Sequence, residues 1–309
     1  MSKVTIVGAG KYGSMTALRV AESDNVSEVV MTDIIAGLPQ GLALDMNQSR
    51  YVENFQTEIR GTNSYKDTNN SDVVVITAGL PRKPGMSRMD LLSTNGKIIK
   101  DVTNNIMEYS PSPKIIVVTN PLDQMTTLVA ETSGLPKQNV IGQAGILDSS
   151  RFAYFISKKT GVPMKEIKAL TLGSHGETMV PVPSQCLVNQ KKLTELLSDH
   201  EIGELVEKTS KGGAEIVELL KTGSAYFAPA SAAAQMVNAI VVDSNEVLPV
   251  CAWMSGEYGI SDVYLGVTSR IGSNGVEEII ELPLDSTEIK ELREASESVK
   301  LKVAELKNI

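Results

Sequence analysis

Two uninterrupted apolar runs most constrain how this chain can fold. They are VVVI at 73–76 and IIVV at 115–118. Strands that are apolar on both faces are typical of parallel sheets covered by helices. We predict strands at 4–7, 28–32, 57–60, 72–77 and 114–119. Helices are predicted between and after them, at 11–22, 41–49, 90–109 and 122–132. This alternating order predicts an α/β fold with a doubly wound parallel sheet of the Rossmann type.

The second half of the chain has a different pattern. Helices are predicted at 149–159, 199–222 and 228–242, and strands at 168–172 and 263–271. A last helix is predicted to begin at the capping pair Asp285 and Glu288. We therefore predict a Rossmann domain over residues 1–145 and a C-terminal α+β domain over residues 146–309. The cleft between them is the expected place for a site.

Composition excludes several classes of partner. The formal net charge is −8 at pH 7, whereas nucleic-acid and anionic-membrane binding depend on clustered Lys and Arg. No apolar run reaches the roughly 18 residues of a membrane span, and the N-terminus lacks a secretion-signal pattern. We therefore expect an unexported, cytoplasmic protein. Cys186 and Cys251 lack a metal-binding spacing, so we expect reduced, buried thiols and no metal site.

A glycine motif follows the first predicted strand and opens the first helix. It consists of Gly8, Gly10 and Gly13 in VTIVGAGKYG. Glycines at these positions permit a tight turn and close approach of a pyrophosphate to a helix N-terminus. Asp33 lies 20 residues beyond Gly13, where a carboxylate can bind the adenosine ribose and would repel the 2′-phosphate of NADP. The motif predicts NAD, although a lone GxGxxG is weak and Asp33 could instead cap a turn.

The two histidines lie in different contexts. His200 lies at a polar helix start and is predicted to be a solvated surface residue. His175 lies in LTLGSHGETMVP, on a turn that follows an apolar strand. An imidazole there could exchange protons near neutral pH, although a lone histidine is more often structural.

The segment GILDSSRF places Asp148 and Arg151 three positions apart at the start of a predicted helix. Residues at this spacing are neighbours on one helix face. Asp148 could orient an imidazole, while the planar guanidinium of Arg151 could bind a carboxylate. The alternative is an N-cap Asp that makes an ordinary i,i+3 ion pair.

The stretch LPRKPGMSR, residues 80–88, concentrates three cations and no acid in an acidic chain. Its two prolines and one glycine are incompatible with ordinary helix or strand. Two interpretations are open. The stretch is either a solvated surface loop, or a lid whose cations close on an anionic ligand.

Together with Asp33, the motifs GAGKYG, AGLPRKPGMSR, VTNPLD, GILDSSRF and GSHGE resemble those of the lactate/malate dehydrogenase family, in their order and intervals. The resemblance covers essentially the whole chain. Within the family, the chain resembles the malate dehydrogenases of lactate-dehydrogenase type found in bacteria. This implies reversible hydride transfer between (S)-malate and NAD, giving oxaloacetate and NADH, in a homo-oligomer that is a dimer or a tetramer. Two departures are Gly176 and Glu177, where relatives often carry Asp, and the bulky Tyr12 in the glycine loop.

The resemblance also implies roles for individual residues. His175 and Asp148 would form a proton relay, and Arg151 would hold the C1 carboxylate. Arg88 on a closing loop would polarise the reacting carbonyl, and Asn120 would hydrogen-bond the substrate. The expected NAD contacts are Gly8, Ala9, Gly10, Lys11, Tyr12, Gly13, Asp33, Asn95, Val118, Thr119 and Asn120.

Arg82 is the residue that predicts the substrate. In the family, the position six before the loop arginine is usually glutamine in lactate enzymes and arginine in malate enzymes, and Arg82 precedes Arg88 by six. An arginine enclosed beside a methyl group would be a buried unpaired cation, at a cost of about 3 to 5 kcal/mol, whereas a second carboxylate would pair with it. This favours a small dicarboxylate, malate or oxaloacetate. The alternatives are a dehydrogenase of lactate or another monocarboxylic 2-hydroxy acid, and a non-catalytic NAD-binding regulator.

Overall fold

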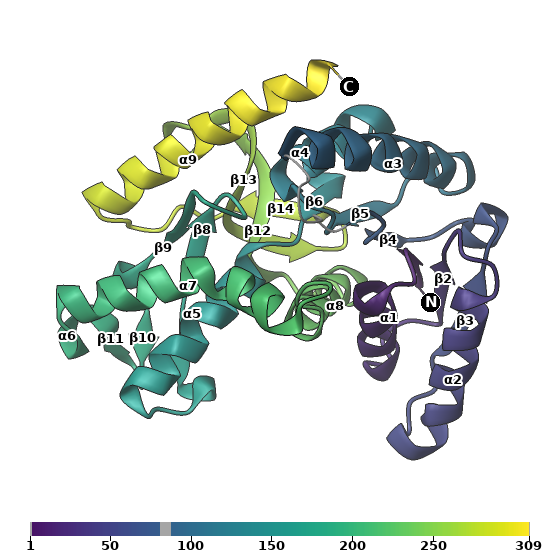
Figure 1. Cartoon of the computed structure of the whole chain (residues 1–309), viewed down its shortest axis with the longest axis horizontal. Helices are drawn as coiled ribbons and strands as arrows, with labels where there is room; N and C mark the ends of the chain where they lie inside the picture. The colour runs from purple at the N-terminus through teal and green to yellow at the C-terminus, as the bar shows by residue number, and fades with distance from the viewer. Residues whose placement is uncertain (1, 81–87, 309) are drawn as a thin grey trace.

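The protein is described by a computed structural model that covers residues 2–80 and 88–308, without the side chains of residues 88, 307 and 308. In Figure 1 the helices α3 (Arg88–Tyr109) and α4 (Leu122–Ser133) lie on one side of the central strands, and α8 (Phe227–Val241) lies on the other side, next to α1 (Lys11–Glu22).

The first half of the chain alternates strands and helices as predicted. Its strands are β1 (Lys3–Val7), β2 (Glu28–Thr32), β3 (Glu58–Thr62), β4 (Val73–Ile76), β5 (Lys114–Val117) and β6 (Val140–Gly142). Its helices are α1 (Lys11–Glu22), α2 (Leu38–Glu53), α3 (Arg88–Tyr109) and α4 (Leu122–Ser133). All six strands pair in parallel, in the order β3-β2-β1-β4-β5-β6. The predicted doubly wound Rossmann sheet is confirmed.

The apolar run of β4 is explained by its place in the sheet. Val73 and Val75 join an apolar core that includes residues of α1 and α8, whereas Val74 and Ile76 join a second core with residues of α3 and α4. Successive side chains of a strand point to opposite faces, so a strand covered on both faces is apolar throughout.

The second half of the chain carries strands of uneven length, from two to twelve residues. The strands are β7 (Ile167–Lys168), β8 (Thr171–Gly173), β9 (Met179–Pro181), β10 (Leu187–Val188), β11 (Lys191–Lys192), β12 (Glu246–Ser255), β13 (Ser261–Gly272) and β14 (Gly275–Ile279). The helices are α5 (Gly145–Thr160), α6 (Leu193–Leu196), α7 (Asp199–Leu220), α8 (Phe227–Val241) and α9 (Ser286–Ala304). Short 3₁₀ helices lie at Tyr65–Thr68, Lys137–Asn139, Met164–Glu166, Pro183–Gln185, Glu257–Gly259 and Glu305–Asn308.

One sheet runs through both halves of the chain. Beyond β6 it continues with β12, β13, β8 and β9, and β14 pairs with β13. The junction is antiparallel and brings Cys251 of β12 opposite Gly142 of β6. A Cβ on Gly142 would lie 2.7 Å from the Cβ of Cys251, so a side chain at 142 would force the strands apart. The two halves are therefore joined by backbone pairing as well as by packing.

Some of the predicted elements were wrong or incomplete. The single strand predicted at 168–172 is wrong, because β7 and β8 are separate strands in different sheets. Strand β12 was not predicted, because its sequence EVLPVCAWMS contains a proline and lacks regular alternation. The predicted start of the last helix is confirmed, because Asp285 and Glu288 form a capping box at α9.

Helix α8 lies where the two halves meet. It contains a run of small residues, ASAAA at 230–234, of which Ala230, Ala232, Ala233 and Ala234 are buried. Small side chains allow close approach, and α8 packs beside α1, as Figure 1 shows. An element of the second half thus lies against the helix that the glycine motif opens.

Candidate active site

The glycine motif forms a tight turn between β1 and α1. Gly8 has φ +103° and donates from its N to the Thr32 carbonyl at 2.8 Å. A Cβ on Gly13 would lie 1.8 Å from the Gly8 carbonyl oxygen, so position 13 accepts glycine alone. Nothing lies within 4 Å of the point where a Cβ would sit on Gly10. Gly10 also makes no side-chain cap, which leaves first-turn N–H groups of α1 for an anion.

Asp33 lies beside this turn. Its Oδ2 accepts from the Ala9 N at 2.7 Å, and its Oδ1 accepts from the Ile35 N at 2.9 Å. A carboxylate has about four acceptor positions, so two remain for ribose hydroxyls. The open Gly10, the helix N-terminus and Asp33 together fit a dinucleotide.

A second group of predicted cofactor residues lies at the carboxyl ends of β4 and β5. The buried Asn95 accepts from the Leu80 N at 2.8 Å and donates to the Asn120 carbonyl at 2.7 Å. Thr119 donates to the Ala78 carbonyl at 2.6 Å, and the Val118 N donates to the Ile76 carbonyl at 3.0 Å. Asn95 thus fastens two loops together, while the side chain of Asn120 is exposed.

The structure brings His175, Asp148 and Arg151 together. The Nδ1 of His175 lies 2.8 Å from the Oδ2 of Asp148, and the Nη1 of Arg151 donates to the Oδ1 of the same carboxylate at 3.0 Å. Asp148 is buried, whereas the His175 side chain keeps 17% of its surface exposed. Asp148 lies inside the first turn of α5 and is not its N-cap, which is Ala144. One carboxylate therefore orients both an imidazole and a guanidinium.

The charges around His175 favour its protonated form. Burial lowers the pKa of His175, but the charge and hydrogen bond of Asp148, with the charge of Asp123, outweigh burial. The net pKa direction is upward, so the imidazolium persists above its ordinary range. His200, in contrast, has a side chain that is 84% exposed, as predicted for a surface residue.

The two loop arginines lie largely outside what the structure describes. Arg82 falls in the stretch 81–87, outside the described residues. Arg88 is the first residue of α3, but its side chain is not described. Their proposed substrate contacts stay predictions.

Asp123 was not among the predicted site residues. It lies in the motif VTNPLD, follows the cis Asn120–Pro121 bond, and is buried. Its Oδ2 accepts from the His175 backbone N at 3.3 Å, and its Oδ1 lies 3.4 Å from the Sγ of Cys251. Burial raises the pKa of both the Asp123 carboxyl and the Cys251 thiol. The available signal was an acid in the first turn of α4, shortly after the apolar strand β5.

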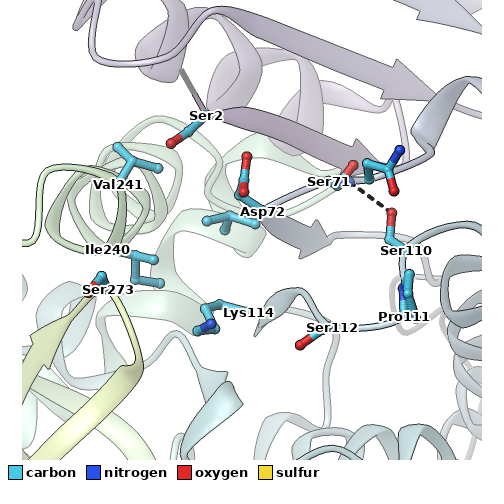
Figure 2. Close-up of a pocket in the computed structure, with 12 residues that line it drawn as sticks. Ser2, Ser71, Asp72, Ser110, Pro111, Ser112, Lys114, Ile240, Val241 and Ser273 are labelled. Carbon is cyan, nitrogen blue, oxygen red and sulfur yellow. Dashed lines mark hydrogen bonds between the residues drawn. The ribbon is translucent and has the colours of Figure 1, made fainter.

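A cavity of about 380 Å³ lies away from this cluster. Figure 2 shows its lining, which includes Asp72 and Lys114 at the amino ends of β4 and β5. The Ser71 and Ser110 hydroxyls beside it already donate to the Thr68 carbonyl. Parallel sheets of this type bind ligands at the opposite, carboxyl edge.

Within residues 2–80 and 88–308, no group of three or more His, Cys, Asp or Glu side chains could hold a metal ion. No helix of the same described residues is long and apolar enough to cross a membrane.

Comparison with known proteins identifies the family. A profile of the lactate/malate dehydrogenase NAD binding domain matches residues 2–142, and one of the lactate/malate dehydrogenase alpha/beta C-terminal domain matches residues 146–309. The chain belongs to the lactate/malate dehydrogenase family. The family resemblance predicted from the motifs is confirmed. A relative within the family, the malate dehydrogenase of Nostoc punctiforme, is 51% identical over 300 residues, which cover 97% of this chain and 91% of the relative.

Solved structures of the lactate/malate dehydrogenase family share the whole fold. The malate dehydrogenase of Salinibacter ruber matches with a TM-score of 0.95 and 44% identity, over 99% of this chain and 98% of that chain. The lactate dehydrogenase of Cryptosporidium parvum, solved with lactic acid and nicotinamide adenine dinucleotide, also has a TM-score of 0.95, with 39% identity over 100% of this chain and 98% of that chain. Backbone similarity therefore does not separate malate from lactate enzymes.

Proposed function

We propose that this chain is an NAD-dependent malate dehydrogenase, which interconverts (S)-malate and oxaloacetate. The observation that carries the proposal is the Asp148 carboxylate held between His175 and Arg151. A proton-exchanging imidazole beside a carboxylate-binding guanidinium suits a 2-hydroxy acid. The malate dehydrogenases among its relatives support the choice of substrate.

The residues would divide the work as follows. Arg151 binds the C1 carboxylate of malate, because one Nη1 contact to Asp148 leaves further donors of its planar fork. His175 accepts the proton of the C2 hydroxyl at Nε2, since Nδ1 is engaged by Asp148. In the reverse direction the imidazolium returns this proton to the oxygen of oxaloacetate, where Arg88 supplies a further positive charge.

The cofactor would lie along the carboxyl edge of the Rossmann sheet. Bound NAD supplies the acceptor for the hydride that leaves C2. The glycine turn and the N-terminus of α1 hold its pyrophosphate, and Asp33 holds its adenosine ribose. Val118, Thr119, Asn120 and Asn95, which lie together beside the carboxyl ends of β4 and β5, are assigned to further contacts with NAD. We also propose residues 1–145 as the cofactor domain and residues 146–309 as the substrate domain.

The paired assay of oxaloacetate and pyruvate, each with NADH and NADPH, tests the proposal. We expect NADH and oxaloacetate to give the highest turnover. Arg82→Gln should lower the oxaloacetate-to-pyruvate preference by about 10² to 10⁴, from the cost of an unpaired buried cation. Lys83→Gln, which removes the neighbouring cation, is the control and should leave the ratio unchanged. Pyruvate preferred by the unmodified protein would establish the lactate alternative. NADH binding without turnover of either acid would establish the regulator.

We further propose that the protein is a homo-oligomer. Helix α2 exposes large apolar side chains, with 62% of Leu44, 95% of Tyr51 and 78% of Val52 accessible. Such residues on one helix are typical of an interface. A second copy of the chain is the proposed partner, and Val52→Glu should lower the mass measured by light scattering.

We propose a cytoplasmic location, which the free, buried thiols of Cys186 and Cys251 support, because thiols stay reduced in that compartment.

A further inference from the structure

Tyr12 is the bulky residue of the glycine turn. It is the second residue of α1, between Gly10 and Gly13 in the sequence. Its half-buried ring packs against the apolar core to which α1 and α8 both contribute. The backbone of Tyr12 is therefore part of the glycine turn, and its side chain packs where α1 meets α8.

The Tyr12 hydroxyl reaches two other segments. It donates to the Pro229 carbonyl at 2.8 Å and lies 3.2 Å from the Oε1 of Gln143. Burial raises the pKa of the Tyr12 phenol, so the hydroxyl stays protonated and able to donate. Pro229 lies in the first turn of α8, 217 positions away along the chain.

Gln143 connects this contact to the residues at the substrate. It follows β6, and its N donates to the Val117 carbonyl at the end of β5 at 2.8 Å. It also lies two residues before α5, which carries Asp148 and Arg151. The Gln143 side chain is buried, and its Nε2 has no hydrogen-bond partner among the described residues. The Tyr12 hydroxyl is thus the one described partner of this side-chain amide, and its single proton is shared between the Gln143 Oε1 and the Pro229 carbonyl.

We propose that Tyr12 is a positioning residue, whose hydroxyl couples occupation of the glycine turn by the dinucleotide to the geometry of the substrate site. The inference rests on the proposed function, because it requires binding of both NAD and a dicarboxylate. A dinucleotide that holds the N-terminus of α1 also holds Tyr12. Through Pro229 and Gln143, Tyr12 restrains the starts of α8 and α5. The two ligands therefore favour the same arrangement, which is a coupling between their sites.

The test measures this coupling directly. The dissociation constant of NADH is determined from its fluorescence, with and without saturating hydroxymalonate, a dicarboxylate that NADH does not reduce. The ratio of the two constants is the coupling factor, and by linkage it applies equally to both ligands. We expect a factor well above one for the unmodified protein. In Tyr12→Phe, which keeps the ring, we expect the factor to fall about threefold to tenfold, with an unchanged circular dichroism spectrum.

Tyr154→Phe is the matched control. Tyr154 lies on α5 with 46% of its surface exposed, and removal of its hydroxyl should leave the factor unchanged. Gln143→Met removes the second partner and should also lower the factor, which provides a test if Tyr12→Phe does not fold. The proposal is overturned if both variants retain the full coupling factor, if Tyr154→Phe loses it equally, or if hydroxymalonate does not tighten NADH binding to the unmodified protein. Failure of that protein to bind NADH at all would instead contradict the proposed function.

Discussion

At the scale of single residues, the Asp148 carboxylate is the centre of the site. It contacts His175 with one oxygen and Arg151 with the other. Since Asp148 raises the pKa of His175, Asp148→Asn should lower that pKa. Reduction of oxaloacetate needs the imidazolium, so kcat/KM should fall off at a lower pH in the variant, and its plateau should drop by about 10² to 10⁴. A pH profile of the reduction measures both effects.

The exposed Asp101 on α3 provides the control, because Asp101→Asn removes a carboxylate far from the imidazole in the sequence. An unshifted pH profile in Asp148→Asn would contradict the assignment of Asp148 as the partner of His175.

The same raised pKa of His175 has a consequence for stability. Protonated His175 stabilises the folded protein. This stabilisation is fully present below the pKa of about 6.5 that histidine has in the unfolded chain, and it is lost as the pH rises through the higher pKa of His175 in the folded protein.

Gly213 determines the room around Arg151. It lies inside α7, and a Cβ there would lie 3.4 to 3.6 Å from the guanidinium. Gly213→Ala should raise the free energy of unfolding by about 0.5 to 1 kcal/mol, because glycine is unfavourable inside a helix. The methyl group would also occupy space beside the guanidinium, and we expect KM for oxaloacetate to rise about fivefold, or about 1 kcal/mol. Urea unfolding and initial rates measure these two effects.

Gly203, in the same helix, gives a matched comparison. Nothing lies within 4 Å of the point where its Cβ would sit. Gly203→Ala should therefore bring a similar gain in stability with no change in KM. Equal effects of the two substitutions on KM would contradict the prediction that a side chain at position 213 disturbs the guanidinium of Arg151.

At the scale of secondary-structure elements, the start of α9 depends on two carboxylates. Asp285 accepts from the N of Thr287 at 2.8 Å and from that of Glu288 at 2.9 Å. The buried Glu288 accepts from the N atoms of Asp285 and Ser184. Asp285→Ala should cost about 1 kcal/mol of unfolding free energy. Glu288→Ala should cost about 2 to 3 kcal/mol, because charged hydrogen bonds to two segments are lost.

Urea denaturation of the two variants tests this prediction, because Glu288→Ala should lose more unfolding free energy than Asp285→Ala. Glu294, in an exposed i,i+4 pair with Lys290, is the control on the same helix, and Glu294→Ala should cost less than about 0.5 kcal/mol. A larger loss at Asp285 than at Glu288 would show that the contact with Ser184 contributes little.

At the scale of the whole molecule, the shared sheet predicts cooperative unfolding. Because β6 pairs with β12 and α8 packs on α1, separation of the two halves would expose unpaired strand edges and apolar core residues on both of them. We expect a single calorimetric transition. NADH at about 100 times its dissociation constant should stabilise the protein by about 2.7 kcal/mol and raise Tm by about 4 °C. Two transitions, of which NADH moves one alone, would show that the halves unfold independently.

The elements that could be predicted from the sequence were those with a local signal. The apolar runs of β4 and β5 indicated strands covered on both faces, and the capping pair at Asp285 indicated the start of α9. Strand β12 could not be predicted in this way. Its pairing with β6 joins residues more than 100 positions apart, and its proline and irregular pattern hide its period. The predicted strand at 168–172 failed because β7 and β8 pair with different partners.

By itself, the sequence determined the family, the Rossmann sheet and the candidates His175, Asp148 and Arg151, because residue type and spacing carry that information. The tertiary structure alone decided how these groups meet, since their contacts are set by long-range packing. It placed one carboxylate between an imidazole 27 positions away and a guanidinium three positions away. It also buried Asp123 against the backbone of His175 and joined Tyr12 to Pro229 across 217 positions. Such contacts have no local pattern, because packing between distant segments creates them.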